Sequence, residues 1–257
     1  MLHRIRPRLV TFDVTGTLLM TKLVEHYSEI ASQHGIVVTD KDELARSFEQ
    51  NFKRLEREHP VYGRHTGLGW ENWWRQIVHN VFKDQDKRLS DESLDKVASN
   101  LIECYATRRC WHTYPGVLEI LNYLESQGIV LGVISNFDER LDSVLVSTKI
   151  RRYFSFVLSS YTHGVEKPDP SIFEEALRLA GKTRGISLKP EEAMHVGDTL
   201  ENDYIGATNA RWNAALVKHR ENHDVNDRVI FIDENQVPPD HQFNNLRQLQ
   251  RHFESLL

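Results

Sequence analysis

An aspartate stands where the first short apolar run of the chain ends. Leu9 to Phe12 are mostly apolar, Asp13 follows them, and the pair Gly16-Thr17 comes soon after. Such a run is typical of a buried parallel strand that ends in a turn. The carboxylate is then placed at the carboxyl end of the strand, which is the edge of an open α/β sheet where ligands bind. Asp13 is therefore the first candidate for chemistry.

Further polar groups follow later apolar runs or lie in the loops beyond them. Ser135 and Asn136 come after VLGVI and offer a hydroxyl and an amide that could hold a phosphate oxygen. Lys167 lies in GVEKPDP, a loop that Pro168 and Pro170 stiffen. These positions predict an amide, a hydroxyl and a cation at the same edge of the sheet as the first aspartate.

Two carboxylates, Asp198 and Asp203, occur in HVGDTLEND about one helical turn apart. This spacing suits the ligands of a hard cation. Each group also has a structural explanation: Ser135 as a helix cap, Lys167 as a surface charge and Asp198 as an N-cap. The order of the four groups along the chain favours one shared site.

The elements that must position these side chains alternate between strands and helices from Thr113 onwards. The expected strands span 129–134, 154–158, 193–196, 214–217 and 229–232. Helices are expected over 117–128, 138–148, 170–180 with Gly181 as its end, 202–209, and a C-terminal amphipathic segment with Leu246, Leu249, Phe253 and Leu256. Strands separated by helices imply crossover connections and a parallel sheet, so the fold class is α/β.

Between these parts, residues 24–109 lose the strand pattern and show apolar residues at helical spacing. We expect a core of residues 1–20 and 111–257 with an inserted helical cap of residues 21–110. A glycine-rich loop with Gly63, Gly67 and Gly69 interrupts the cap. Trp70, Trp73 and Trp74 share a helical face, as an aromatic seam inside the cap or as a platform for a ligand.

Composition describes an ordinary globular protein. The 257 residues are 40% hydrophobic and 27% charged, with a formal charge of -5, so no nucleic-acid-binding or membrane face stands out. Cys104 and Cys110 are the only cysteines and no apolar run is long enough to span a bilayer, so we expect a reducing, intracellular, cytoplasmic setting and no dependence on disulfides. The arginines near the start of the chain are interpreted as solvated charges flanking the first strand.

The four groups and their order resemble the motifs of the haloacid dehalogenase-like (HAD) hydrolase superfamily. The resemblance covers the whole chain and implies a Rossmann-like parallel sheet with an inserted helical cap of the first type, and a central strand that bears Asp13. Within the superfamily, FDVTGTLL, YGRHTGLGWENWW, VISNFDERL and EKPDPSIFEEAL resemble the rhythmically expressed gene proteins and the haloacid dehalogenase-like hydrolase domain-containing protein three subfamily.

The resemblance also implies roles for individual residues. Asp13 is expected to attack a phosphoryl group, with Mg²⁺ held by Asp13, Asp198, Asp203 and the backbone carbonyl of Thr15. Lys167 is expected to offset negative charge, and Ser135 to grip phosphoryl oxygens with help from Thr17 and Asn136. One departure is plain: family phosphatases carry a second aspartate two positions after the nucleophile, and this chain has Thr15, as the family's cation-transport ATPases do.

Three interpretations follow. The first is a Mg²⁺-dependent phosphohydrolase for a small phosphorylated molecule, slowed by the lack of a general acid and working as a monomer or weak dimer. The second is a binding or regulatory protein that keeps the site without turnover. The third, dehalogenation, is the least favoured because that chemistry needs no metal and gives Asp198 and Asp203 no task. His65, in the glycine-rich loop, is either a proton donor that contacts substrate or a solvated loop histidine.

Overall fold

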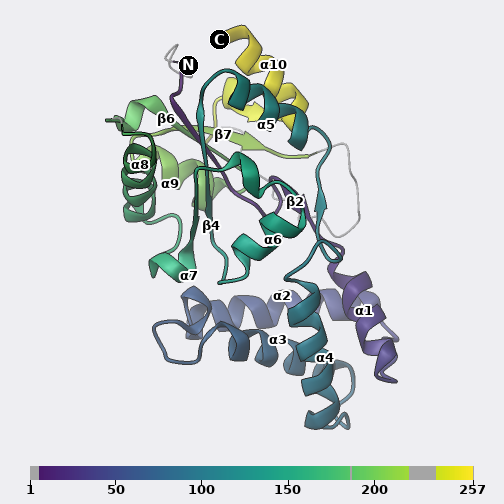
Figure 1. Ribbon diagram of the computed structural model, residues 1–257. Coiled ribbons are helices and arrows are strands. Elements are labelled where there is room, and N and C mark those ends of the chain that lie inside the picture. The colour runs from purple at the N-terminus through teal and green to yellow at the C-terminus, as the bar shows by residue number, and fades with distance from the viewer. Residues whose placement is uncertain (1–5, 186, 220–235, 257) are drawn as a thin grey trace. The chain divides into compact units, whose positions relative to one another are not determined.

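The computed structural model describes residues 6–185, 187–219 and 236–256 (Figure 1). Within these ranges the main sheet has six strands in the order β5-β4-β1-β6-β7-β8. All neighbouring strands run parallel. The strands are β1 (Leu9–Phe12), β4 (Val130–Ser135), β5 (Phe156–Ser159), β6 (Ala193–Gly197), β7 (Asn213–Val217) and β8 (Gln242–Phe243). The expected α/β class is thereby confirmed, whereas the strand expected at 229–232 lies outside the described residues.

Strand β1 is central because it is apolar on both faces. Leu9, Val10 and Phe12 have no exposed surface, as expected for a strand covered from both sides. The strand pairs with β4 on one side and β6 on the other, with Leu9 opposite Val130 and Ala193. The residues that follow β1, β4 and β6 therefore meet at one edge of the sheet.

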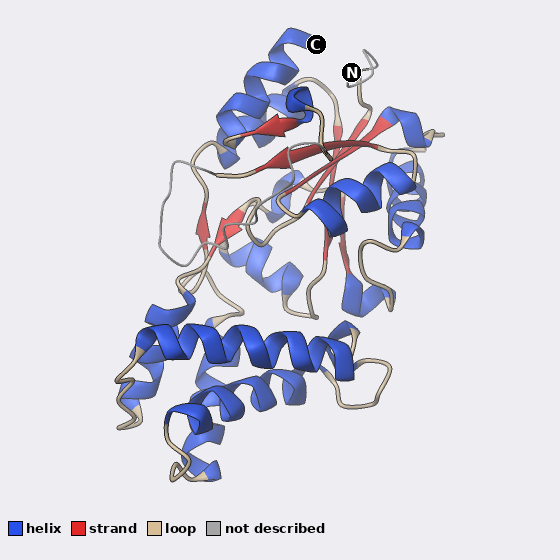
Figure 2. Cartoon of the chain, turned by 180° about the vertical axis from the view of Figure 1, so that it is seen from behind, coloured by secondary structure: helices blue, strands red, loops and turns tan. Residues whose placement is uncertain are grey.

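Helices cover both faces of the sheet (Figure 2). On one face, α8 (Pro170–Arg184) and α9 (Gly206–Asn209) contribute to a core that includes residues of β1, β4, β5, β6 and β7. On the other, α5 (Val117–Ser126) contacts α10 (Leu246–Leu256). Shorter elements are α6 (Leu141–Ser147), η2 (Arg151–Tyr153), α7 (Ser160–His163), η3 (Pro190–Glu192), the π-helical η4 (Leu200–Ile205) and η5 (Pro239–His241).

Helix α8 runs one turn further than the sequence suggested. Gly181 was expected to end it, but Gly181 lies inside the helix and its carbonyl accepts the N–H of Gly185. Gly185 has a φ of 64°, the left-handed conformation that glycine adopts at helix ends. The expected end was therefore wrong because two glycines compete and only the second takes the left-handed conformation.

The inserted segment is helical and packs around aromatic rings. Its elements are α1 (Leu23–Gln33), α2 (Lys41–Glu58), η1 (Val61–Gly63), α3 (Trp70–Gln85) and α4 (Asp91–Cys104). Asp40 and Ser90 cap α2 and α4 by accepting backbone N–H groups of the first turn. Trp73 is 1% exposed and lies against the rings of Phe52, Tyr62 and Trp74. Trp73 and Trp74 thus form part of an aromatic seam within the helical segment.

The chain divides into two compact units, one of residues 1–20, 113–136 and 149–257 and the other of residues 21–112 and 137–148. The segment 137–148 groups with the helices of the insert, unlike in the expected division. Trp74 Nε1 donates to Asp138 at 2.7 Å, and Arg140 donates to the carbonyl of Ile102 at 3.1 Å. Where the chain passes between the units, β2 (Leu19–Met20) and β3 (His112–Thr113) form a separate two-stranded sheet.

Cys104 and Cys110 form a disulfide at the end of α4. The sequence predicted a reducing setting and a fold that does not depend on disulfides. The two thiols pair because the chain turns back after α4 and brings them together across six positions. Among the described residues, no helix has both the length and the apolar character to cross a membrane.

Candidate active site

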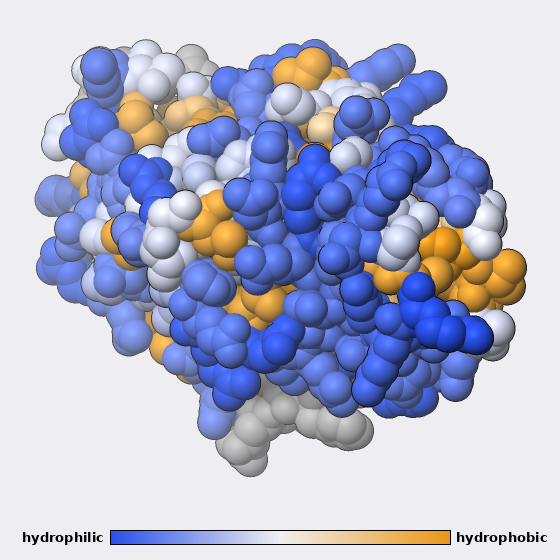
Figure 3. Space-filling view, turned by 90° about the horizontal axis from the view of Figure 1, so that it is seen from below, coloured by the Kyte–Doolittle hydropathy of each residue, from blue (hydrophilic) through white to orange (hydrophobic). Residues whose placement is uncertain are grey.

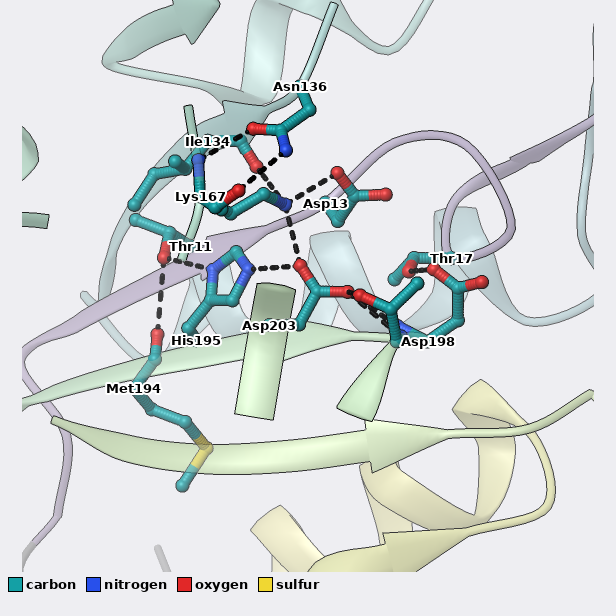
Figure 4. A network of polar contacts seen from close by, with 11 residues as sticks. Thr11, Asp13, Thr17, Ile134, Asn136, Lys167, Met194, His195, Asp198 and Asp203 are labelled. Carbon is teal, nitrogen blue, oxygen red and sulfur yellow. Dashed lines mark hydrogen bonds and ion pairs between the residues drawn. The ribbon is translucent and has the colours of Figure 1, made fainter. Parts of the chain in front are cut away.

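Polar side chains from several strand ends and loops of the α/β unit meet at one place (Figure 4). Asp13 directly follows β1 and is 7% exposed. Asp198 follows β6, Asp203 lies in η4, and Lys167 reaches in from the loop before α8. The predicted groups Asp13, Lys167, Asp198 and Asp203 are therefore assembled by the parallel sheet, since the carboxyl ends of neighbouring strands share one edge.

Lys167 is the cation of the cluster and is only 2% exposed. Its Nζ donates to Asp13 Oδ1 at 2.7 Å, to Asp203 Oδ1 at 2.6 Å and to the carbonyl of Ile134 at 3.0 Å. All three ammonium hydrogens thus have acceptors. Burial acts to lower the pKa of Lys167, but the charges of Asp13 and Asp203 outweigh it and raise the pKa, so the ammonium stays charged.

Asp203 is saturated by donors from the protein. Its Oδ1 accepts from Lys167 Nζ and from His195 Nε2 at 3.0 Å. Its Oδ2 accepts from the backbone N–H of Asp198 at 3.2 Å and from the N–H and hydroxyl of Thr199 at 2.9 and 2.7 Å. Burial would raise the pKa of Asp203, but the Lys167 charge and the His195 hydrogen bond hold it well below its usual range. Asp203 is an ionised carboxylate that orients the loop around it.

Asp198 is the opposite case. From the described residues its carboxylate accepts one side-chain hydrogen bond, from the Thr17 hydroxyl at 3.1 Å. Burial, together with the charges of Asp203 and Asp13, raises the pKa of Asp198 well above the usual value. Gly16, with a φ of 84°, lies so close that a Cβ there would overlap this carboxyl group. The site thus brings a poorly compensated carboxylate against the loop that follows Asp13.

The three carboxylates are close enough to share one cation. Ligand oxygens of Asp13, Asp198 and Asp203 lie within 4.8 Å of one another. Lys167 is the single cation bonded to this group among the described residues, so two negative charges remain uncompensated when all three are ionised. Burial also raises the pKa of Asp13, in spite of Lys167. Oxygen donors with excess negative charge fit a hard divalent ion such as Mg²⁺.

The model of the haloacid dehalogenase-like hydrolases matches residues 7–211, a range that contains β1 and the whole cluster. The chain belongs to this family. The rhythmically expressed gene 2 protein of Drosophila melanogaster is 38% identical over 223 residues, which cover 84% of each chain. The haloacid dehalogenase-like hydrolase domain-containing protein 3 of Homo sapiens is 36% identical over 208 residues and 80% of each chain. The narrower resemblance seen in the sequence is thereby confirmed.

Solved structures of HAD proteins share the fold over nearly the whole chain. The HAD-hydrolase YfnB of Bacillus subtilis, bound to magnesium, has a TM-score of 0.71 at 15% identity and covers 97% of this chain and 99% of its own. A 2-haloacid dehalogenase of Pseudomonas syringae has a TM-score of 0.65 at 23% identity and covers 98% and 100%. At such identities the likeness concerns the fold, and the chemistry must be argued from the site.

Other residues expected at this HAD site lie in different settings. Ser135 ends β4 and is 1% exposed, and Asn136 exchanges two hydrogen bonds with the backbone of Lys167, at 2.9 and 2.8 Å. Asn136 thus holds the lysine loop, as Thr17 holds Asp198. Thr15 is exposed in the turn after β1, and His65 is exposed in the loop between η1 and α3 of the helical unit.

Sequence reasoning missed Thr11 and His195, which lie beneath the cluster. Both are fully buried, and Thr11 Oγ1 is 2.8 Å from His195 Nδ1. The signal was present, because each is a polar residue in an otherwise apolar strand. Thr11 lies two positions before Asp13, and His195 lies two positions before Gly197, the last residue of β6. Polar groups at such positions need partners, because an unpaired buried donor or acceptor is costly.

Proposed function

We propose that this protein is a Mg²⁺-dependent phosphohydrolase that forms an aspartyl phosphate on Asp13 and acts on a small phosphorylated molecule. The observation that carries the proposal is the state of the Asp13 carboxylate. Lys167 holds Oδ1, whereas Oδ2 accepts no hydrogen bond from the described residues and points away from the lysine (Figure 4). A carboxylate with one fixed and one open oxygen is arranged as a nucleophile.

The proposed reaction has two steps, and residues of this chain act in both. In the first, Asp13 Oδ2 attacks phosphorus, and the ester P–O bond breaks with its electron pair on the leaving oxygen, which takes up a proton from solvent. In the second, water attacks phosphorus, loses a proton, and the bond between phosphorus and Asp13 breaks to release inorganic phosphate. Lys167 offsets charge on Asp13 throughout, while the Ser135 hydroxyl and backbone N–H groups of the loop after β1 bind phosphoryl oxygens.

Mg²⁺ would be held by Asp13, Asp198 and the backbone carbonyl of Thr15. Asp203 would act on this ion through a water molecule or by orienting Asp198, because its own oxygens already accept five hydrogen bonds. When bound, the ion would offset the repulsion between the nucleophile and the phosphate. Asp198 supports this assignment, because burial and the charges of Asp203 and Asp13 raise its pKa, and a bound cation would offset those charges.

Thr15 limits the rate that we expect. Its side chain cannot ionise, so neither protonation of the leaving oxygen nor activation of water comes from this position. General acid–base help of this kind is worth roughly 10²- to 10⁴-fold. The protein should therefore be slow, and slowest on esters with poor leaving groups.

The loop that contains His65 is our candidate for substrate choice. Gly63, Gly67 and Gly69 all have positive φ, which gives this segment a shape that other residues rarely adopt. If His65 donates a proton to substrate, replacing it with alanine will remove a limb of the pH–rate profile. An unaltered profile would identify it as a solvated loop residue.

A second function has one observation in its favour, again Thr15. A HAD protein that binds metal and phosphate without turnover would serve as a binding or regulatory protein. Protection by vanadate or beryllium fluoride in the presence of Mg²⁺, without hydrolysis of any ester, would support this alternative.

The same proposal extends to the setting of the protein. We infer a cytoplasmic monomer or weak dimer that binds neither nucleic acid nor membranes. The face seen in Figure 3 is mainly hydrophilic, with apolar residues in several separate groups, and the exposed large apolar residues Val37, Leu118 and Val146 are far apart in sequence. Light scattering at several concentrations and non-reducing electrophoresis of the protein from cell extracts would test the oligomeric state and the thiol state.

The deciding experiment is a screen of phosphate esters with and without Mg²⁺, with the Asp13→Asn protein as the blank. We expect slow, Mg²⁺-dependent release of phosphate that the blank lacks. Release that persists in the blank, or that ignores Mg²⁺ after treatment with a chelator, would refute the proposed mechanism.

A further inference from the structure

A histidine occupies the middle of central strand β6, directly beneath the candidate active site. His195 has no exposed surface and lies opposite Thr11 in the register of β1 and β6. Its Nδ1 is 2.8 Å from Thr11 Oγ1 and its Nε2 is 3.0 Å from Asp203 Oδ1. The rings of Phe173 and His195 are nearly perpendicular, with centroids 5.4 Å apart. Both nitrogens are used and the ring is fixed from several directions.

The partners of the ring determine where its hydrogen lies. Ionised Asp203 can only accept a hydrogen bond, so the hydrogen of the imidazole must be on Nε2. With its hydrogen on Nε2, the ring leaves Nδ1 as an acceptor that faces the Thr11 hydroxyl. The Thr11 hydroxyl then donates to Nδ1 at 2.8 Å, in preference to the more distant carbonyl of Met194 at 3.5 Å.

From this arrangement we propose that His195 is a positioning residue for the reaction at Asp13. Its Nε2–H holds Asp203 so that Lys167 is shared between Asp203 and the nucleophile. Figure 4 shows the contacts that link Thr11 to His195 and His195 to Asp203, and with the hydrogen on Nε2 each of these groups donates to the next. This inference rests on the proposed function, since it assigns a residue that supports the same nucleophile.

The sharing of Lys167 explains why a donor at this place matters. Lys167 Nζ lies 2.6 Å from Asp203 and 2.7 Å from Asp13, so the two carboxylates compete for one ammonium. Without the hydrogen bond from His195, Asp203 would be less well compensated and would attract the Lys167 ammonium more strongly. Lys167 would then offset less of the charge on Asp13. Asp203 also holds the N–H groups of Asp198 and Thr199, so a shift of its carboxylate would move the metal-binding loop as well.

A pair of amide variants separates the donor from the bulk of the ring. The amide of His195→Gln reaches about as far as Nε2 and keeps a donor for Asp203. His195→Asn reaches only about as far as Nδ1 and keeps the contact with Thr11 alone. Both are polar and uncharged, but asparagine is one methylene smaller, so a role in packing alone predicts a Tm lowered most in His195→Asn and a beryllium fluoride affinity nearly unchanged in both.

The measured quantity is the affinity for beryllium fluoride in saturating Mg²⁺, an analogue of the phosphoryl group on Asp13. We expect His195→Asn to bind it roughly 10-fold or more weakly, the size of a lost hydrogen bond to a charged group. His195→Gln should stay within about threefold of the unmodified protein. Equal losses in the two variants, or no loss in His195→Asn, would overturn the proposal.

A measurement on the unmodified protein covers the case in which the variants fail to fold. Long-range ¹H–¹⁵N spectra should contain a neutral histidine that is protonated on Nε2, bare on Nδ1 and slow to exchange, and Thr11→Val should alter its Nδ1 signal. Protonation of that ring on Nδ1, or on both nitrogens, would overturn the assignment. If the binding and spectra agree with expectation while no ester is hydrolysed, the role of His195 stands and the phosphohydrolase proposal fails.

Discussion

Two buried ion clusters lie in the two units of the molecule and differ in their charge balance. In the balanced cluster of the helical unit, Arg140 meets Asp138 with three hydrogen bonds at 2.6 to 2.9 Å, and its guanidinium lies over the rings of Trp70 and Trp74. In the unbalanced cluster of the α/β unit, Lys167 faces Asp13 and Asp203, with Asp198 beside them.

The difference separates a structural ion pair from a reactive one. Asp138 is 1% exposed, and its oxygens accept from Arg140 and Trp74, so both charges are compensated by groups of the same unit. The unbalanced cluster keeps excess negative charge, an open oxygen on Asp13 and a raised pKa on Asp198. Burial alone therefore does not mark a functional site; burial with uncompensated charge does.

The largest expected effect is on ester hydrolysis and comes from replacing Asp13 in the unbalanced cluster. Asp13→Asn should lower ester hydrolysis by roughly 10⁴-fold or more, because a neutral amide is a poor nucleophile, while the fold is kept. The matched change in the balanced cluster, Asp138→Asn, should instead cost about 3 kcal/mol of stability and leave Mg²⁺ affinity nearly unchanged. Steady-state rates, Tm and calorimetry would compare the two. Undiminished turnover in a clean Asp13→Asn preparation would remove Asp13 from the mechanism.

Thr15→Asp should have the next largest effect, and it should raise turnover rather than lower it. A carboxylate two positions after the nucleophile would supply the missing general acid, so turnover should rise by up to about 10⁴-fold. The gain should be greatest for alkyl phosphates, whose leaving oxygen needs a proton, and small for p-nitrophenyl phosphate. Equal or lower turnover of both ester types by a folded, Mg²⁺-binding variant would show that the acid is not limiting, and would favour the binding-protein function.

Much of this architecture could be predicted from the sequence because it depends on local patterns. The run Leu9 to Phe12 is apolar on both faces, which can be satisfied only in the middle of a covered sheet. Once β1 is central, Asp13 and Asp198 must share an edge, because β1 and β6 are parallel neighbours. Strand periodicity and connection rules predicted parallel strands with polar groups beyond their ends, whereas the central place of the Asp13 strand was implied by the resemblance to the HAD superfamily.

What could not be predicted depends on the conformation of one loop and on a contact between residues that are distant in the sequence. Asp198 and Asp203 look alike in HVGDTLEND, yet only Asp203 receives five donors, because the π-helical η4 turns its carboxylate back onto the preceding loop. The grouping of residues 137–148 with the helical unit depends on Trp74 reaching Asp138 across 64 positions. No local pattern carries either fact.

The two carboxylates of that loop can be distinguished by metal binding. Asp198→Ala removes a direct ligand and should weaken Mg²⁺ binding by about 10-fold or more. Glu201→Ala, at an exposed position of the same segment, is the matched control and should leave the affinity unchanged. Calorimetric titration of both proteins would measure this. Unchanged affinity in Asp198→Ala would refute its assignment as a ligand.

The smallest expected effect is a dependence of stability on pH. Because the pKa of Asp198 is raised by burial and by neighbouring carboxylates, the folded state binds a proton at this site more tightly than the unfolded chain does. In Mg²⁺-free solution, the contribution of Asp198 to stability should therefore increase as the pH falls. Asp203 has the opposite sign, since its pKa is lowered, but its contribution is lost only below about pH 5, near the ordinary titration range of aspartate.

Unfolding of the unmodified protein and of Asp198→Asn, between about pH 7.5 and about pH 6, isolates this contribution. Relative to the variant, whose amide does not titrate, the unmodified protein should gain stability as the pH falls across that range. Saturating Mg²⁺ should reverse the sign, because protons and the cation compete for the same carboxylate. Parallel pH profiles of stability for the two proteins, with and without Mg²⁺, would mean that the charge of Asp198 is already compensated within the protein. The unbalanced cluster would then have no more affinity for a cation than the balanced one.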